Sequence, residues 1–163
     1  MRAKVYLETT IPSYLVARPS RDLLIAAHQQ ITRDWWDRRR RTFDLFVSEI
    51  VEQKSRAGDP LLARRRLELL ADVPVLAANG AILSMARALV TEGAMPSKAL
   101  TDAVHIAFAT VYACDYLLTW NCRHIANAEI QRAARGLARR HGFELPVICT
   151  PEELMGDEYG MER

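Results

Sequence analysis

The chain has 163 residues, of which 50% are apolar and 26% are charged, and its formal net charge is +2. This composition supplies one ordinary apolar core, and it excludes a polybasic tail and an acidic disordered chain. The three cysteines have the spacing of neither a redox pair nor a zinc site, which indicates a reducing compartment. No apolar run approaches a signal core or the ~20 residues of a membrane span. We therefore expect a single cytoplasmic domain over residues 1–163 that makes no contact with a membrane.

Five short apolar runs mark the expected strands in chain order. They lie at residues 4–7, 43–47, 73–76, 116–120 and 146–149. Continuous apolar runs of this length are typical of strands that are buried on both faces of a sheet.

Helical periodicity fills most of the sequence between these runs. Pro12 allows a helix to open after the first strand, and Ser20 is the expected cap of a longer helix over residues 20–40. The apolar stripe of that longer helix is expected at Leu24, Ala27, Ile31 and Trp35. Further helices are expected over residues 49–56, 60–71, 79–92, 97–113 and 123–142, and a frayed acidic tail after residue 149. The helix over residues 97–113 has almost no polar face, so we expect it to be buried.

Strands that alternate with helices predict a parallel sheet with right-handed crossovers. The expected fold class is α/β, with three layers (α/β/α) around a parallel central sheet of about four to five strands. Ligands bind at the carboxyl ends of the strands in such sheets. The residues that follow each strand are therefore the first candidates for function.

Oxygen-bearing side chains follow three of the expected strands. Glu8 follows the first strand, Glu49 the second and Asn121 the fourth. Asp102 lies near the start of the apolar helix over residues 97–113, where the helix dipole favours a carboxylate but polar neighbours are few. Because a buried ionised carboxylate needs a partner or a metal, Asp102 is the strongest candidate for a functional residue among these four side chains.

A pocket shared by Glu8, Glu49 and Asp102 would hold up to three negative charges. Oxygen ligands favour Mg²⁺ or Mn²⁺, and an open carboxylate site suits metal-assisted hydrolysis of a phosphodiester. Each acid also has a structural interpretation, because acids after strands often cap helices or occupy their first turn. Glu52 lies three residues after Glu49 on the same helix face, so either is a candidate for the central acid.

Four segments, spread over nearly the whole chain, resemble the motifs of a PIN domain, particularly of a VapC-like toxin. They are the run Val5-Tyr6-Leu7-Glu8-Thr9-Thr10, the acid Glu49, residues 101–107 and residues 117–121. The first motif of the family, an acid followed two positions later by Ser or Thr, falls on Glu8 and Thr10. The fourth, usually Thr, any residue and Asp, falls on residues 119–121. Glu8 and Asn121 stand where Asp is usual in the family.

The resemblance implies a PIN-like fold and an endoribonuclease that depends on Mg²⁺ or Mn²⁺. It implies that Glu8, Glu49 and Asp102 hold the metal and that Thr10 and Asn121 support the metal, water or phosphate. It also implies the toxin of a type II toxin–antitoxin pair, with RNA as substrate, a small antitoxin protein as partner and a homodimer as the assembly. Because Asn121 removes one negative charge, a single-metal site is favoured over a two-metal site.

Two other functions agree with the same residues. A catalytically degenerate PIN-like module that binds RNA or a protein is motivated by the replacements at Glu8 and Asn121. A DNA-directed or flap-type nuclease uses the same metal chemistry.

Two basic segments are candidates for a nucleic-acid surface. The first joins Trp35 and Trp36 to the arginines at 38–41, although core packing and a solvated helix end are the favoured interpretation. The second is one face of the helix over residues 123–142, with Arg132, Arg135 and Arg139, for which a plain solvent face is equally consistent.

Two histidines lie close to the acidic residues. His105 follows Asp102 by three positions and His124 follows Asn121, and both are interpreted mainly as hydrogen-bonded structural residues.

Overall fold

The structure is a computed structural model, and it describes residues 1–157. Five parallel strands form one sheet in the order β3-β2-β1-β4-β5. Their bounds are β1 Lys4–Leu7, β2 Asp44–Ser48, β3 Val75–Leu76, β4 Tyr116–Leu118 and β5 Val147–Cys149. Each lies within two residues of the run that predicted it, and the expected parallel sheet is confirmed.

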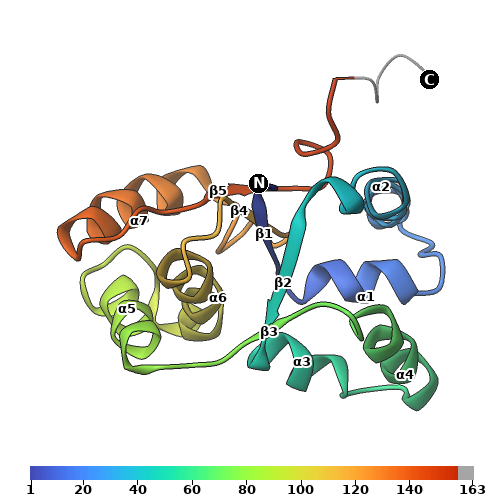
Figure 1. The fold of residues 1–163 in the computed structure, drawn as a ribbon, viewed down its shortest axis with the longest axis horizontal. Coiled ribbons are helices and arrows are strands. Elements are labelled where there is room, and N and C mark those ends of the chain that lie inside the picture. The colour runs from blue at the N-terminus through green and yellow to red at the C-terminus, as the bar shows by residue number, and fades with distance from the viewer. Residues whose placement is uncertain (158–163) are drawn as a thin grey trace.

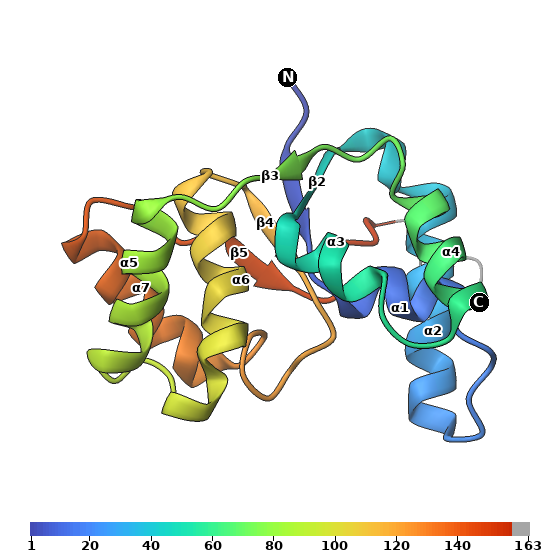
Figure 2. The same ribbon diagram turned by 90° about the horizontal axis from the view of Figure 1, so that it is seen from below.

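Helices cover both faces of the sheet, which confirms the three-layer α/β/α fold class. In Figures 1 and 2, α5, α6 and α7 lie on one side of the strands, and α1, α2 and α4 lie on the other. The α-helices are α1 Thr10–Val16, α2 Leu23–Arg38, α3 Glu49–Ser55, α4 Pro60–Leu69, α5 Gly80–Thr91, α6 Leu100–Val111 and α7 Ala128–Arg140. Two short 3₁₀ helices, η1 Arg40–Thr42 and η2 Ser97–Ala99, precede β2 and α6.

The strand order creates a switch point between β1 and β4. The strand β1 lies at the centre of the sheet. The next two strands, β2 and β3, lie on one side of β1, and the last two, β4 and β5, lie on the other side, so the strand order reverses between β1 and β4. The connection after β1 runs through α1 and α2 on one face, and the connection after β4 runs through α7 on the other (Figure 1). Such a divergence opens a crevice at the carboxyl ends of the two strands, where ligands bind in α/β sheets.

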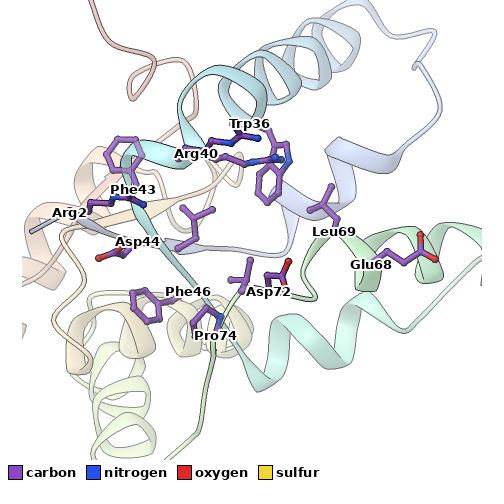
Figure 3. A pocket seen from close by; sticks show the side chains of 13 residues that line it. Arg2, Trp36, Arg40, Phe43, Asp44, Phe46, Glu68, Leu69, Asp72 and Pro74 are labelled. Atoms are coloured by element: carbon purple, nitrogen blue, oxygen red, sulfur yellow. The ribbon is translucent and has the colours of Figure 1, made fainter.

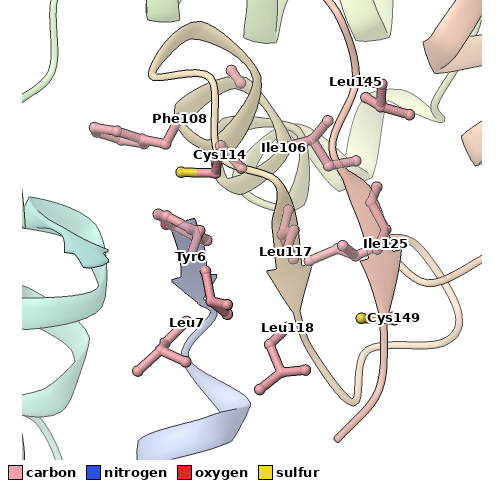
Figure 4. Packing of buried hydrophobic residues seen from close by; sticks show 14 of the residues in the cluster. Tyr6, Leu7, Ile106, Phe108, Cys114, Leu117, Leu118, Ile125, Leu145 and Cys149 are labelled. Atoms are coloured by element: carbon pink, nitrogen blue, oxygen red, sulfur yellow. The ribbon is translucent and has the colours of Figure 1, made fainter. Parts of the chain in front are cut away.

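The core lies between the central strands and α6. Tyr6 and Leu7 of β1 and Leu117 and Leu118 of β4 are fully buried, and Figure 4 shows these strands packed beside Ile106 and Phe108 of α6. Burial of β1 and β4 on both faces explains their continuous apolar sequences. The buried character expected for α6 is confirmed from Ala103 to Thr110 except at Val104, whereas Leu100 in its first turn is exposed.

The start of α2 differs from the expectation. Its cap is Asp22, which accepts a hydrogen bond from the amide of Ile25, and not Ser20. Leu24 and Ala27, expected in the apolar stripe, are exposed, whereas Ile31 and Trp35 are buried as expected. The reason is that the first half of α2 extends past the body of the molecule (Figure 2), so its apolar face has nothing to pack against.

The acidic tail is ordered over its described part, and there the expectation of fraying is wrong. Trp35 Nε1 donates a hydrogen bond to the carbonyl of Leu154 at 3.2 Å, and Met155 is buried. These contacts attach the segment after β5 to α2. Residues 158–163 of the expected tail lie outside the described residues.

Candidate functional site

Glu8 directly follows β1 and is almost completely buried, with 4% of its surface exposed. Its Oε1 accepts hydrogen bonds from Thr119 Oγ1 at 2.6 Å and from Thr10 Oγ1 at 2.8 Å. Its Oε2 accepts a third hydrogen bond, from the amide of Thr10 at 3.1 Å. Hydrogen-bond donors, and not a basic side chain, therefore compensate for the burial of this carboxylate.

The same two threonines join the end of β1 to the end of β4. The amide of Trp120 donates to Thr10 Oγ1, and the amide of Asn121 donates to Thr119 Oγ1, both at 2.9 Å. Each hydroxyl thus accepts one backbone hydrogen bond and donates one to Glu8. The network therefore fixes the ends of the two strands relative to each other at the switch point.

Asp102 lies in the first turn of α6 and contacts the residues that follow β4. Asn121 Nδ2 donates to Asp102 Oδ1 at 3.1 Å, and His124 Nδ1 lies 3.1 Å from Asp102 Oδ2. Asn121 Oδ1 in turn accepts a hydrogen bond from the amide of His124 at 3.0 Å. The structure therefore brings Glu8, Thr10, Asp102 and Asn121 into one hydrogen-bond network, in which Asn121 links Asp102 to the Thr119 hydroxyl that contacts Glu8.

Glu49 occupies a different position from these residues. It is the first residue of α3, it is exposed, and its Oε2 accepts a hydrogen bond from the amide of Ala78 at 3.2 Å. Glu52 instead forms an ion pair with Arg56 at 2.8 Å. No hydrogen bond among residues 1–157 joins either glutamate to the network of Glu8 and Asp102. Because no basic side chain within the described residues pairs with Glu49, whereas Arg56 pairs with Glu52, Glu49 remains the better candidate for the central acid.

The donor set suits a hard divalent cation in chemical type, because it consists of carboxylate, hydroxyl and amide oxygens. With the side chains as they stand, no group of three or more His, Cys, Asp or Glu residues within 1–157 is arranged to hold a metal. Within the same residues, no ion pair with Lys or Arg neutralises Glu8, Glu49 or Asp102. The assignment of these three as metal ligands stays a prediction.

A buried polar cluster beneath the site connects the three elements that carry the acids. The hydroxyl of Tyr6 lies 2.8 Å from Ser48 Oγ and 2.8 Å from His105 Nδ1. These residues belong to β1, β2 and α6, and they lie two residues before Glu8, one before Glu49 and three after Asp102. The cluster therefore fixes the positions of those elements relative to one another.

Burial controls the protonation of this cluster. Desolvation lowers the pKa of His105 to about 3, and the positive charge of nearby Lys54 adds to the shift. Desolvation also raises the pKa of Tyr6 above its ordinary value. His105 is thus neutral, and its structural interpretation is confirmed, whereas the histidine that contacts Asp102 is His124.

Trp120 attaches the loop after β4 to α2. Its Nε1 donates to Thr32 Oγ1 at 2.7 Å, and its ring stacks on that of His28 with centroids 3.9 Å apart. His28 and Thr32 carry no sequence signal that marks them as part of the site, whereas Thr119 occupies the first position of the fourth motif.

The remaining sequence candidates lie outside this network. Arg132, Arg135 and Arg139 are exposed on α7, and Arg139 pairs with Glu144 at 3.0 Å. The three cysteines are free thiols, of which only Cys122 is exposed. No helix within residues 1–157 is long and apolar enough to cross a membrane.

Comparison with known proteins identifies a fold relationship. No family model and no curated protein matches the chain. Among solved structures, the chain is similar to one chain in the crystal structure of VapBC2 from Rickettsia felis, which is bound to a DNA fragment from the VapBC2 promoter. The two chains are 13% identical, and the TM-score is 0.52. The alignment covers 90% of this chain and 98% of that one. The chain therefore shares its three-layer α/β/α fold with that chain over nearly its whole length.

Proposed function

We propose that the protein is a divalent-metal-dependent endoribonuclease of the PIN/VapC type that acts as the toxin of a type II toxin–antitoxin pair. The observation that carries the proposal is the network that joins Glu8, Asp102 and Asn121 at the switch point of a PIN-like sheet. These are the positions at which the sequence motifs of the family fall. The similarity in fold to a chain of VapBC2 supports the same assignment.

Glu8, Glu49 and Asp102 are the residues that would hold Mg²⁺ or Mn²⁺. A bound cation of this kind activates water and stabilises negative charge on a phosphodiester. The threonines at 10 and 119 hold the Glu8 carboxylate in one orientation, and Asn121 does the same for Asp102. About a quarter of the Asp102 side chain is exposed (24%), so this carboxylate is accessible to solvent.

The proposed partners follow from the family assignment. They are an RNA substrate, a small antitoxin protein and a second copy of the chain. The structural neighbour is itself a VapBC2 assembly on DNA, which supports a partner protein for this chain. Expression with a protein encoded by an adjacent short reading frame, followed by co-purification, tests the antitoxin.

Cleavage of RNA tests the enzymatic part of the proposal. Structured RNA and a matched DNA are incubated with the protein in Mg²⁺, in Mn²⁺ and in EDTA. We expect cleavage of RNA only with metal, and a loss of at least about a hundredfold in the Asp102→Asn variant, since loss of a metal ligand exceeds the 10–100-fold cost of outer-shell changes. The control is Asp72→Asn, which changes an exposed acid after α4. Metal-independent cleavage, or equal activity of Asp102→Asn, contradicts the proposal.

The same experiment separates the alternatives. The replacement of Asp by Glu and Asn at positions 8 and 121 favours the degenerate module, which binds RNA without cutting it. That function predicts RNA binding that is unchanged by EDTA. A DNA-directed nuclease predicts cleavage of the DNA arm.

A further inference from the structure

The groove shown in Figure 3 is separate from the acidic site. It has a volume of about 770 Å³ and lies beside residues 44–46 of β2, with residues 68–74 on its other side. Arginines and carboxylates line it in equal numbers, so its charge selects neither an anion nor a cation. None of its lining residues belongs to the network of Glu8 and Asp102. The groove therefore contributes no ligand to a cation bound at that network.

His124 is the histidine that contacts an acid of the site. The chain has four histidines, all among the described residues 1–157. His105 lies beneath the site in the cluster of the Tyr6 hydroxyl, His28 stacks on the ring of Trp120, and His141 lies at the end of α7. His124 alone among these four places a ring nitrogen beside a carboxylate that is a candidate metal ligand.

The loop after β4 holds the backbone of His124 in place. Its amide donates a hydrogen bond to Asn121 Oδ1 at 3.0 Å. The next two amides, of Ile125 and Ala126, donate to the carbonyl of Asn121 at 3.2 and 2.8 Å, and Ile125 is fully buried. The position of the His124 ring is therefore set by rotation of its side chain about a fixed backbone.

Asp102 is more open to a cation than Glu8. Three hydrogen-bond donors occupy both oxygens of Glu8, which is 4% exposed. The partners of Asp102 are two side chains of the loop after β4, those of Asn121 and His124, and 24% of the Asp102 side chain is exposed. Rotation of the His124 ring breaks its contact with Asp102 but leaves the backbone hydrogen bonds of the loop intact. A cation is therefore expected to replace the contact between these two side chains.

The spacing of the two side chains suits shared ligation. His124 Nδ1 lies 3.1 Å from Asp102 Oδ2. Two neighbouring ligands of an octahedral ion, each about 2.1 Å from it, are themselves about 3 Å apart. A neutral imidazole carries its proton on either nitrogen, and with the proton on Nε2 the lone pair of Nδ1 is free to bind. The nitrogen and the carboxylate oxygen can therefore bind one ion without a change in their separation.

We propose that His124 is a ligand, through Nδ1, of the divalent cation that Asp102 binds, and that this nitrogen makes the site select Mn²⁺ over Mg²⁺. An all-oxygen site accepts both ions, whereas Mg²⁺ takes oxygen ligands and imidazole binds the first-row transition ions better. The inference rests on the proposed function, and it chooses between the two ions that the sequence leaves open.

Electron paramagnetic resonance of bound Mn²⁺ tests the ligand directly. The full chain is labelled with ¹⁵N in histidine alone, and electron spin echo envelope modulation detects nitrogen nuclei that are bound to the ion. We expect coupling to ¹⁵N in the wild type and its loss in His124→Asn, which keeps a polar side chain but has no ring nitrogen. His141→Asn, at the end of α7, is the control and is expected to retain the coupling. Coupling that persists in His124→Asn overturns the proposal.

Competition between the two ions measures the selectivity. The concentration of Mg²⁺ that displaces half of the bound Mn²⁺ is expected to be about tenfold or more lower for His124→Asn than for the wild type, on the order of the losses that follow changes around a metal site. Equal concentrations for the two proteins contradict a role of His124 in the choice of ion.

The same measurements separate this inference from the proposed function. Mn²⁺ that binds the wild type without coupling to a histidine nitrogen removes His124 from the ligand set, and metal-dependent cleavage of RNA would then leave the proposed nuclease intact. Mn²⁺ that does not bind the wild type contradicts both. Because the label reports on the wild type itself, these two outcomes do not depend on the folding of a variant.

Discussion

The buried cluster of Tyr6, Ser48 and His105 predicts a specific loss of stability in acid. In the folded protein His105 stays neutral down to a pKa of about 3, against an ordinary value of 6.5. The unfolded chain takes up a proton below pH 6.5 and the folded chain does not, so the free energy of unfolding falls as the pH falls from 6.5 towards 3. Above 6.5 the contribution is fully present, and below 3 it stops decreasing.

The size of the effect follows from linkage. Each pH unit between the two pKa values changes the free energy of unfolding by about 1.4 kcal/mol. From pH 7 to pH 5, His105 alone is therefore expected to lower the stability by about 2 kcal/mol. Because the side chain is 1% exposed, solvent screening does not reduce this figure appreciably.

Urea unfolding followed by tryptophan fluorescence at about pH 7 and pH 5 measures this change. His105→Asn retains a polar atom near the Tyr6 hydroxyl but cannot titrate. Between pH 7 and pH 5 the free energy of unfolding of this variant is therefore expected to fall by about 2 kcal/mol less than that of the wild type. Arg132→Gln, at an exposed position of α7 that does not titrate in this interval, is the control and is expected to follow the wild type. Equal losses in the wild type and His105→Asn would refute the burial of a neutral histidine in this cluster.

Three further changes test other parts of the structure. Thr119→Val removes the 2.6 Å hydrogen bond to buried Glu8 and is expected to lower the free energy of unfolding by about 1–3 kcal/mol, measured by urea unfolding; no measurable loss would contradict the network. Asp22→Ala removes the cap of α2 and is expected to cost about 1 kcal/mol by the same measurement, whereas Ser20→Ala would cost as much only if the helix began earlier. Glu49→Gln is expected to reduce metal-dependent RNA cleavage by about a hundredfold or more, because loss of a metal ligand exceeds the cost of outer-shell changes, and Glu52→Gln is expected to leave it unchanged; the reverse result would assign the central acid to Glu52.

The central strands β1 and β4 could be predicted from the sequence because they are buried on both faces. Burial of this kind requires short continuous apolar runs, such as residues 5–7 and 116–118, and the polar residues Glu8 and Thr119 follow these two strands. The carboxyl-end rule then selected Glu8 and Asn121, and the cost of an acid in an apolar helix selected Asp102. The structure places these three in one network.

Other features depend on tertiary arrangement that local patterns do not contain. The stripe predicted at Leu24 and Ala27 is exposed because α2 extends past the sheet, and periodicity cannot show where a helix loses its neighbour. The contact of His124 with Asp102 depends on the turn after β4, which brings the two side chains within 3.1 Å across 22 residues of sequence. The hydrogen bond from Trp35 to the carbonyl of Leu154 joins residues that are more than a hundred positions apart in the sequence.

A crystal structure of the protein with Mn²⁺, in which anomalous scattering locates the ion, tests whether Glu8, Glu49 and Asp102 bind one divalent cation at the switch point between β1 and β4. We expect an anomalous peak in contact with all three carboxylates, with Asp102 released from His124. A structure soaked in Mn²⁺ with no peak at this position, and with Asp102 still bonded to Asn121 and His124, would contradict it.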